Sequence, residues 1–324
     1  MTVASIPDAL DVPDTLDARI RAHELAAYRH FGIEPEEELH LVDTYVGERQ
    51  VRVMHFGPTD SPLPPVLVMH GVGSFSVLAV EMFPYLAGRR VMVMDWPGHG
   101  LSGECVLPNP LCLRDMAVST LRGLLDELAI PVVDLIAHSV GSQFSLYAAI
   151  DMPRRVRRMV LMGAPAGAFP KSHPILPMLL IALPVLGRAA LAREVTESSF
   201  TRFNDQAIGV GAGAHLPPDV MAAGRLISNR PSYAPSVNSY CNALVRGRSV
   251  RPVNHIGLDE LSRITHPTLI VWGDKDAFQN PMLAATSIVA IRNHRLLRLP
   301  HAGHAPWLDE PEVVGTAIAE HLSA

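Results

Sequence analysis

The sequence predicts an α/β fold: a doubly wound, mostly parallel sheet with an inserted, mainly helical cap. Short apolar runs rich in Val, Leu, Ile and Met recur along the chain between Gly or Pro residues, as expected for strands buried on both faces. Amphipathic helical segments alternate with these runs, which is typical of a parallel sheet. The alternation stops near residue 166 and resumes after residue 255. We therefore expect a core of residues 1–165 and 256–324 and a cap of residues 166–255.

The expected elements follow in chain order. Two segments with alternating apolar residues flank Gly47-Glu48 and predict an antiparallel hairpin at the edge of the sheet. Buried strands are predicted at PVLVMHG, VMVMDWPG, VVDLIAHSVG, VRRMVLMGAP and PTLIVWGD, and a further strand at HRLLRLP. Apolar residues at helical spacing between Leu113 and Leu128 predict a helix packed on the sheet. The segment SQFSLYAAI predicts another helix.

Composition and charge limit the classes of protein to which this chain can belong. The chain has 324 residues, of which 48% are hydrophobic and 18% charged, so it can form a large core and is not a disordered protein. Its net charge of -5 does not indicate the positively charged surface that nucleic-acid binding requires, and we expect no nucleic-acid partner. Residues 166–255 carry nine Lys or Arg against four Asp or Glu, which either attracts a carboxylate-bearing substrate or forms an ordinary solvated surface.

The cysteines and the start of the chain indicate a cytoplasmic protein. Three cysteines without CxxC spacing predict neither a disulfide framework nor a thiolate metal site. The first twenty residues are acidic and lack the apolar stretch of a secretory signal. The apolar stretch of residues 172–187 is interrupted by prolines and is too short to span a membrane. We expect it to form cap helices packed on the core, or alternatively a lid over an apolar pocket.

Ser139 is the predicted nucleophile. It lies in Ala137-His138-Ser139-Val140-Gly141, between a predicted strand and a predicted helix. Such a turn flanked by small residues is typical of a nucleophile elbow, where the helix packs too closely on the strand for large side chains. Ala137 stands where glycine is usual. We expect His138 to pack rather than to act in catalysis, because adjacent strand residues point to opposite faces.

A serine hydroxyl needs a general base, and the base needs an acid to orient it. His304 in HAGHAPWLDEP and Asp276 in WGDKDAF supply these residue types downstream of Ser139. Asp274 is the competing acid at the same predicted strand end. The order Ser, Asp, His is that of α/β-hydrolases and differs from the orders in the chymotrypsin and subtilisin folds.

These motifs together resemble those of a capped α/β-hydrolase over nearly the whole chain. HGVGSF is similar to that family's HGxG oxyanion loop, and DWPGHGLSG is similar to its D-x-P-G-[HFY]-G-x-S loop. The resemblance implies a triad of Ser139, His304 and Asp276, because the family's G-x-x-D spacing from Gly273 selects Asp276.

The resemblance also implies an oxyanion hole formed by the backbone N–H groups of Val72 and Val140. Val140 follows the nucleophile at the start of a predicted helix, where the helix dipole favours an anion. We expect His70 to hydrogen-bond its neighbours without transferring a proton, and glycines to give backbone access. The residues expected to shape these loops are His70, Gly71, Gly73 and Gly141.

No metal and no cofactor is predicted. The fifteen histidines include neither an HExxH motif nor a paired HxH motif. We interpret His301 and His304 as a loop residue and a base rather than as zinc ligands.

The expected function is hydrolysis of a small or medium, largely apolar ester, lactone or thioester through an acyl-enzyme. Relatives with the same triad also cleave carbon–carbon bonds or transfer acyl groups, so both remain alternatives. A ligand-binding or cyclase protein on the same fold is the alternative from another class, since fold alone does not determine function. No feature of the sequence predicts an oligomeric state.

Overall fold

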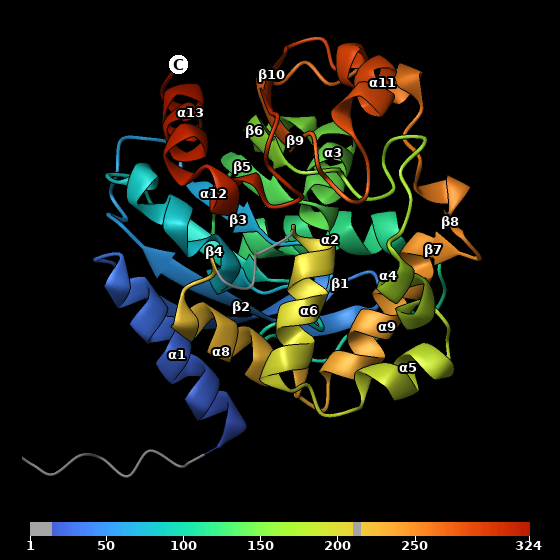
Figure 1. Ribbon diagram of the computed structural model, residues 1–324. Helices are drawn as coiled ribbons and strands as arrows, with labels where there is room; N and C mark the ends of the chain where they lie inside the picture. Colours follow the sequence, from blue (N-terminus) through green and yellow to red (C-terminus); the bar gives the residue numbers. More distant parts are fainter. Residues whose placement is uncertain (1–14, 210–214) are drawn as a thin grey trace, which may run out of the picture.

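The computed structural model describes residues 15–209 and 215–324, and an eight-stranded sheet runs through its centre (Figure 1). The first two strands of the chain form an antiparallel hairpin, the second of them is also antiparallel to its other neighbour in the sheet, and all remaining neighbours are parallel. In spatial order the strands are β1 (Glu36–Thr44), β2 (Gly47–Phe56), β4 (Val91–Asp95), β3 (Val66–Met69), β5 (Val133–His138), β6 (Val156–Met162), β9 (Thr268–Gly273) and β10 (His294–Leu299). The predicted α/β fold with a mostly parallel sheet is confirmed.

The central strands are apolar because both of their faces are covered. Every residue of β3, β4 and β5 is buried, as expected for parallel strands between two helical layers. The edge hairpin instead turns at Gly47, whose φ of +88° favours glycine. Thr44 Oγ1 donates to the carbonyl of Gly47 at 2.6 Å and closes this turn.

Helices form a layer on each face of the sheet (Figure 1). The helices outside the segment between β6 and β9 are α1 (Leu16–His30), η1 (Ser76–Leu86), α2 (Leu113–Glu127), α3 (Val140–Asp151), η2 (Pro153–Arg155), α10 (Leu258–Leu261), η4 (Pro281–Ala284), α11 (Ala285–Ala290), α12 (Pro306–Asp309) and α13 (Pro311–Ser323). On one face α2 contacts β1 and α3, and α3 contacts β5 and β6; on the other, η1 contacts α1, α12 and α13. The predicted helices at residues 113–128 and after Ser139 correspond to α2 and α3.

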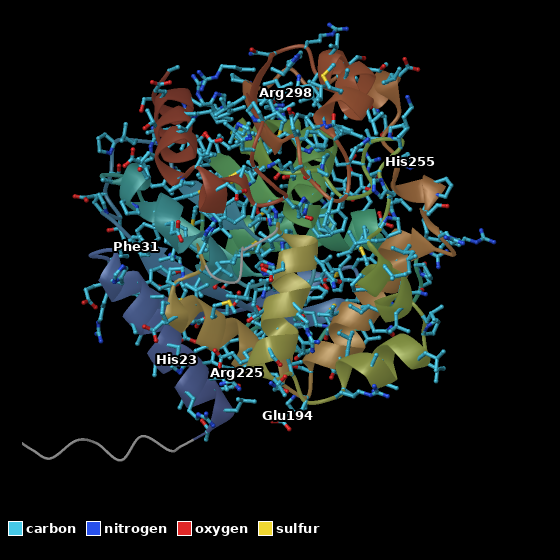
Figure 2. All side chains as sticks on the ribbon, viewed as in Figure 1. His23, Phe31, Glu194, Arg225, His255 and Arg298 are labelled. Carbon is cyan, nitrogen blue, oxygen red and sulfur yellow. The ribbon has the colours of Figure 1, made fainter. Side chains whose placement is uncertain are left out.

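The chain between β6 and β9 is mainly helical and contains no strand of the central sheet in its described part. Its elements are α4 (Leu176–Ile181), α5 (Leu186–Leu191), α6 (Glu197–Ala207), α8 (Pro218–Ser228), α9 (Tyr233–Leu244), β7 (Val245–Arg246), β8 (Ser249–Val250) and η3 (Pro252–Asn254). Helix α8 packs beside α1, and His23 Nδ1 of α1 lies 2.8 Å from Asp219 Oδ1 of α8. Figure 2 labels His23 on α1 and Arg225 on α8.

No helix among the described residues has the length and apolar character that a membrane crossing requires. Of the first twenty residues, on which the expected cytoplasmic location partly rests, residues 1–14 lie outside the described chain.

One buried cluster of charges joins α1 to the sheet. The guanidinium of Arg52 on β2 donates to Glu24 of α1 at 2.6 Å, to Asp95 at 3.1 Å and to Glu37 of β1 at 3.1 Å. Asp95, at the end of β4, also accepts from the backbone N–H groups of Ser76 and Leu101. The cluster therefore fixes the loop that follows β4 relative to η1 and α1.

Candidate active site

Ser139 lies in the sharp turn between β5 and α3. Its φ of +56° and ψ of −116° place a non-glycine residue in a strained conformation, which is common at functional turns. The turn is held by the Ser139 N–H, which donates to the carbonyl of Met162 at 3.0 Å. A Cβ atom at Gly141 would lie 2.8 Å from the carbonyl oxygens of His70 and Met69, so this position needs glycine. The geometry is that of the predicted strand–serine–helix turn.

Asp276 and His304 form a buried pair. His304 Nδ1 donates to Asp276 Oδ2 at 2.8 Å, which leaves Nε2 as the acceptor nitrogen of the neutral ring. The same carboxylate accepts from the N–H groups of Ala164 and Phe278, at 2.8 and 2.9 Å. The competing Asp274 instead pairs with Arg298 of β10, which Figure 2 labels. Only Asp276 can orient His304.

The backbone N–H groups of Val72 and Val140, predicted to form the oxyanion hole, make no hydrogen bond among the described residues, and both residues line the same cavity as Ser139. Val140 is the first residue of α3, where intrahelical bonding leaves N–H groups free. Val72 follows Gly71, and a Cβ atom at Gly71 would lie 3.0 Å from Cβ of Ser139. The loop after β3 therefore passes the serine too closely for a side chain at Gly71.

His70 stabilises this loop by hydrogen bonds, as expected. Its Nδ1 donates to the carbonyl of Gly71 at 2.7 Å, and its Nε2 accepts from the N–H of Trp96 at 3.1 Å. Burial lowers the pKa of His70, although Asp95 opposes the shift, so the ring is neutral near pH 7. Gly73 has a φ of +70°, and its carbonyl accepts from the Tyr233 hydroxyl at 2.9 Å.

Three residues that the sequence does not single out for catalysis hold His304 in place. His138 Nε2 donates to the carbonyl of His304 at 3.0 Å, and its ring packs 4.7 Å from that of His304. Burial and the nearby His304 lower the pKa of His138 far below its ordinary value, so it packs as a neutral ring. The Phe278 ring lies 4.4 Å from the His304 ring. Gly163 has a φ of +66°, and a Cβ atom there would lie 2.4 Å from the His304 carbonyl.

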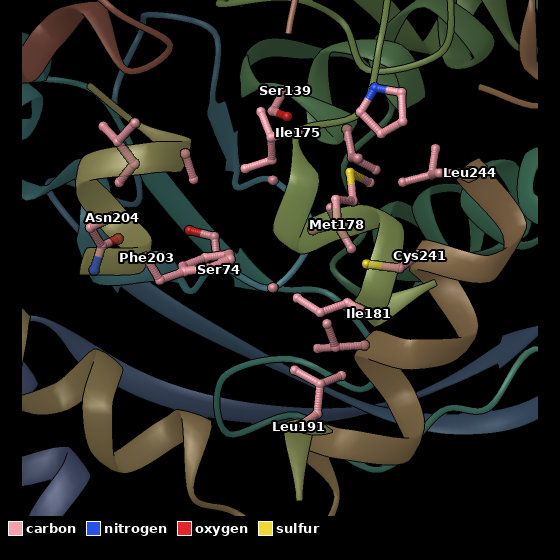
Figure 3. A pocket seen from close by; sticks show the side chains of 18 of the residues that line it. Ser74, Ser139, Ile175, Met178, Ile181, Leu191, Phe203, Asn204, Cys241 and Leu244 are labelled. Atoms are coloured by element: carbon pink, nitrogen blue, oxygen red, sulfur yellow. The ribbon is translucent and has the colours of Figure 1, made fainter. Parts of the chain in front are cut away.

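Ser139 and His304 line a cavity of about 420 Å³, and Figure 3 labels Ser139 at its wall. This volume is in the range of small-molecule sites. Most of the wall comes from apolar side chains between β6 and β9; Figure 3 labels Ile175, Met178, Ile181, Leu191, Phe203, Cys241 and Leu244 among them. Among the described lining residues, Arg193 and Glu194 are the only Arg, Lys, Asp or Glu, and both are exposed. The cavity suits an apolar ligand.

The apolar stretch of residues 172–187 contains α4 and the first two residues of α5, and it faces two environments. On the cavity side, Met178 and Ile181 line the wall. On the outer side, Leu176 and Val185 are 79% and 77% exposed. The stretch therefore forms part of the cavity wall and also leaves an apolar outer surface.

Comparisons with known proteins agree with this geometry. The model of the family described as "Alpha/beta hydrolase family" matches residues 15–317. A 2-hydroxy-6-oxononadienedioate/2-hydroxy-6-oxononatrienedioate hydrolase from Pseudomonas putida is 28% identical over 261 residues, which is 78% of this chain and 86% of that protein.

Solved structures show the same fold. A carboxylesterase from Bacillus subtilis has a TM-score of 0.72 at 17% identity, with 95% of this chain and 98% of that chain covered. The 2-hydroxy-6-oxo-6-phenylhexa-2,4-dienoate hydrolase from Rhodococcus has a TM-score of 0.72 at 19% identity, with coverages of 90% and 100%.

Proposed function

The chain belongs to the alpha/beta hydrolase family, and we propose that it is a serine hydrolase that cleaves a largely apolar ester, lactone or thioester through an acyl-enzyme. The observation that carries this proposal is the convergence of three features on one cavity. These are a strained serine, a histidine oriented by a buried carboxylate, and two unpaired backbone N–H groups.

In the first step, Ser139 Oγ forms a bond to the substrate carbonyl carbon while His304 Nε2 accepts the hydroxyl proton. Asp276 holds the imidazole in the required tautomer and stabilises its protonated form. The N–H groups of Val72 and Val140 donate to the oxyanion, a contribution of about 3 kcal/mol or more per donor in comparable enzymes. His304 then gives the proton to the leaving alcohol, thiol or ring oxygen.

The second step uses water in place of the leaving group. His304 Nε2 accepts a proton from water as the water oxygen bonds to the acyl carbon. The tetrahedral intermediate collapses to the free acid, and the proton returns to Ser139 Oγ. In this proposal residues 166–255 act as the cap, because they supply most of the apolar cavity wall. The His304 N–H donates to the carbonyl of Ile208 at 2.7 Å, so this segment also positions the catalytic loop.

The second candidate is hydrolysis of a carbon–carbon bond next to a ketone, which the names of the relatives favour. The nonadienedioate named for the Pseudomonas relative carries two carboxylates, and each needs a cationic or polar partner. In the described cavity wall Arg193 is the only Arg or Lys, and it lies at the exposed rim. A substrate with one carboxylate could pair with Arg193. The apolar interior favours an ester as the first candidate.

Substrate profiling separates the two candidates. We expect turnover of p-nitrophenyl esters, with kcat/KM rising as the acyl chain lengthens until it fills the cavity, because each buried CH₂ contributes about 0.8 kcal/mol. The parallel assay follows the loss of visible absorbance of a 2-hydroxy-6-oxo-dienoate. Faster turnover of the dienoate than of every ester would reverse the order of the candidates.

Gly163→Ala should lower kcat by about 100-fold, because a methyl group 2.4 Å from the His304 carbonyl must displace the base, and displacements of about 1 Å cost this much. Gly247→Ala is the matched control: its φ is +61°, similar to that of Gly163, but no atom lies within 4 Å of the added Cβ. The measurement is kcat on the best ester, with the melting temperature of each variant. Equal kcat values in the two variants would contradict the role of Gly163 in positioning His304.

A further inference from the structure

A second cluster of chemically competent side chains lies on the edge hairpin, away from the cavity. Glu38 and His40 on β1 and His55 on β2 place one carboxylate oxygen and two imidazole nitrogens within 4.8 Å of one another. In the hairpin register Glu38 is opposite Val53, and Glu36 is opposite His55. Because side chains alternate along a strand, the three residues share one face of the sheet.

The three ligand-type atoms of this cluster are close enough together to contact a single metal ion. Glu38 Oε2 lies 3.0 Å from His40 Nε2 and 3.3 Å from His55 Nε2. Four-coordinate zinc has Zn–N and Zn–O bonds of about 2.0–2.2 Å, so its ligand atoms lie roughly 3.3–3.5 Å apart. Shifts of a few tenths of an ångström in these side chains would place all three atoms around one ion.

Both imidazole nitrogens lack a hydrogen bond that would explain their positions. His40 Nε2 and His55 Nε2 are shielded from solvent, and although the Glu38 carboxylate lies near both, neither nitrogen makes a hydrogen bond. Each histidine side chain is 12% exposed, whereas Glu38 is 49% exposed. Buried polar atoms are normally satisfied, and an exception is commonly explained by an ion or a water molecule. One cation would satisfy both nitrogens at once.

We propose that Glu38, His40 and His55 bind one divalent transition-metal ion, with zinc as the best match to a ligand set of two imidazoles and one carboxylate. The half-exposed carboxylate leaves a fourth position to solvent. Glu36 adds negative charge near His55, and Arg90 opposes it. All three ligands belong to one hairpin, and β1 lies four positions from β5 in the sheet. The ion therefore stabilises the β1–β2 hairpin at the edge of the sheet and takes no part in the reaction at Ser139.

The test uses full-length protein without a histidine tag, freed of metal by dialysis against a chelator. Calorimetric titration with zinc chloride should show one ion per chain, and the melting temperature should rise with zinc concentration, since an ion that binds only the folded state stabilises it. Cobalt(II) bound in place of zinc should give visible absorption bands whose intensity indicates four or five ligands around the ion. The His40→Ala/His55→Ala variant should bind zinc at least 100-fold more weakly.

Two further variants make the outcome decisive. Glu38→Gln keeps the side-chain shape and should weaken zinc binding at least tenfold while far-ultraviolet circular dichroism stays unchanged. His23→Ala is the matched control, because His23 pairs with one carboxylate, that of Asp219, but is not part of the three-donor cluster. It should bind zinc as the parent protein does. No zinc binding by the parent, or equal affinity in the parent and the double variant, would overturn the proposal.

Discussion

Ser139→Ala should lower kcat on the best ester by roughly 10⁴- to 10⁶-fold, because removing a triad nucleophile leaves only oxyanion stabilisation and binding. The fold should persist, since the substitution removes a hydroxyl that makes no hydrogen bond among the described residues. Alanine at this position keeps the strained φ of +56°. The loss should therefore appear in activity and not in the melting temperature.

Intact mass after treatment with a fluorophosphonate checks this prediction independently of any substrate. The parent protein should gain one adduct, Ser139→Ala none, and His304→Ala an adduct at a much lower rate. Ser145→Ala is the control serine on the same helix; its hydroxyl donates to the carbonyl of Gly141 within α3. It should label as the parent does. An adduct of undiminished rate on Ser139→Ala would show that another residue is the nucleophile.

The sheet could be predicted from the sequence because parallel strands buried on both faces need continuous apolar runs. The segment between β6 and β9 could be recognised only as an interruption of that pattern. Its helices α4 and α5 have six residues each, and helices this short depend on tertiary packing rather than on propensity. The two-residue strands β7 and β8 are too short for any periodic signal.

The sequence allowed site residues to be proposed where the expected chemistry requires a side-chain type or a motif contains a glycine, but not where the requirement comes from residues distant in the chain. Asp276 and Asp274 are equivalent as residue types. The structure separates them because Arg298, 24 residues further on, pairs with Asp274. Gly163 carries no local signal, since its requirement comes from the distant backbone of His304. The three-donor cluster at Glu38 was not predicted either, because His55 joins it only through the register of the hairpin.

The charge cluster around Arg52 should be highly sensitive to the loss of a single partner. Burial outweighs the attraction of Arg52 and raises the pKa of Glu24. Burial would also raise the pKa of Asp95, but Arg52 and the backbone donors outweigh it, so this pKa lies below its ordinary value. Removing one partner of a buried ion pair leaves an uncompensated charge, which costs far more than the pair itself contributes.

Arg52→Met should therefore lower the free energy of unfolding at pH 8 by about 3–5 kcal/mol. The difference from the parent should shrink toward pH 5. The variant gains stability as the pH falls, because its buried carboxylates, without Arg52 beside them, bind protons more readily than in the unfolded chain. In the parent, the pKa of Asp95 lies below its ordinary value of 3.8, so this carboxylate stays charged at both pH values. Urea unfolding at both pH values measures this effect. Arg295→Met, which breaks an exposed pair with Glu320, should change stability little at either pH. If Arg52→Met and the parent differed equally at pH 8 and pH 5, uncompensated carboxylates would not be the cause, and the loss would have to come from packing of the arginine side chain.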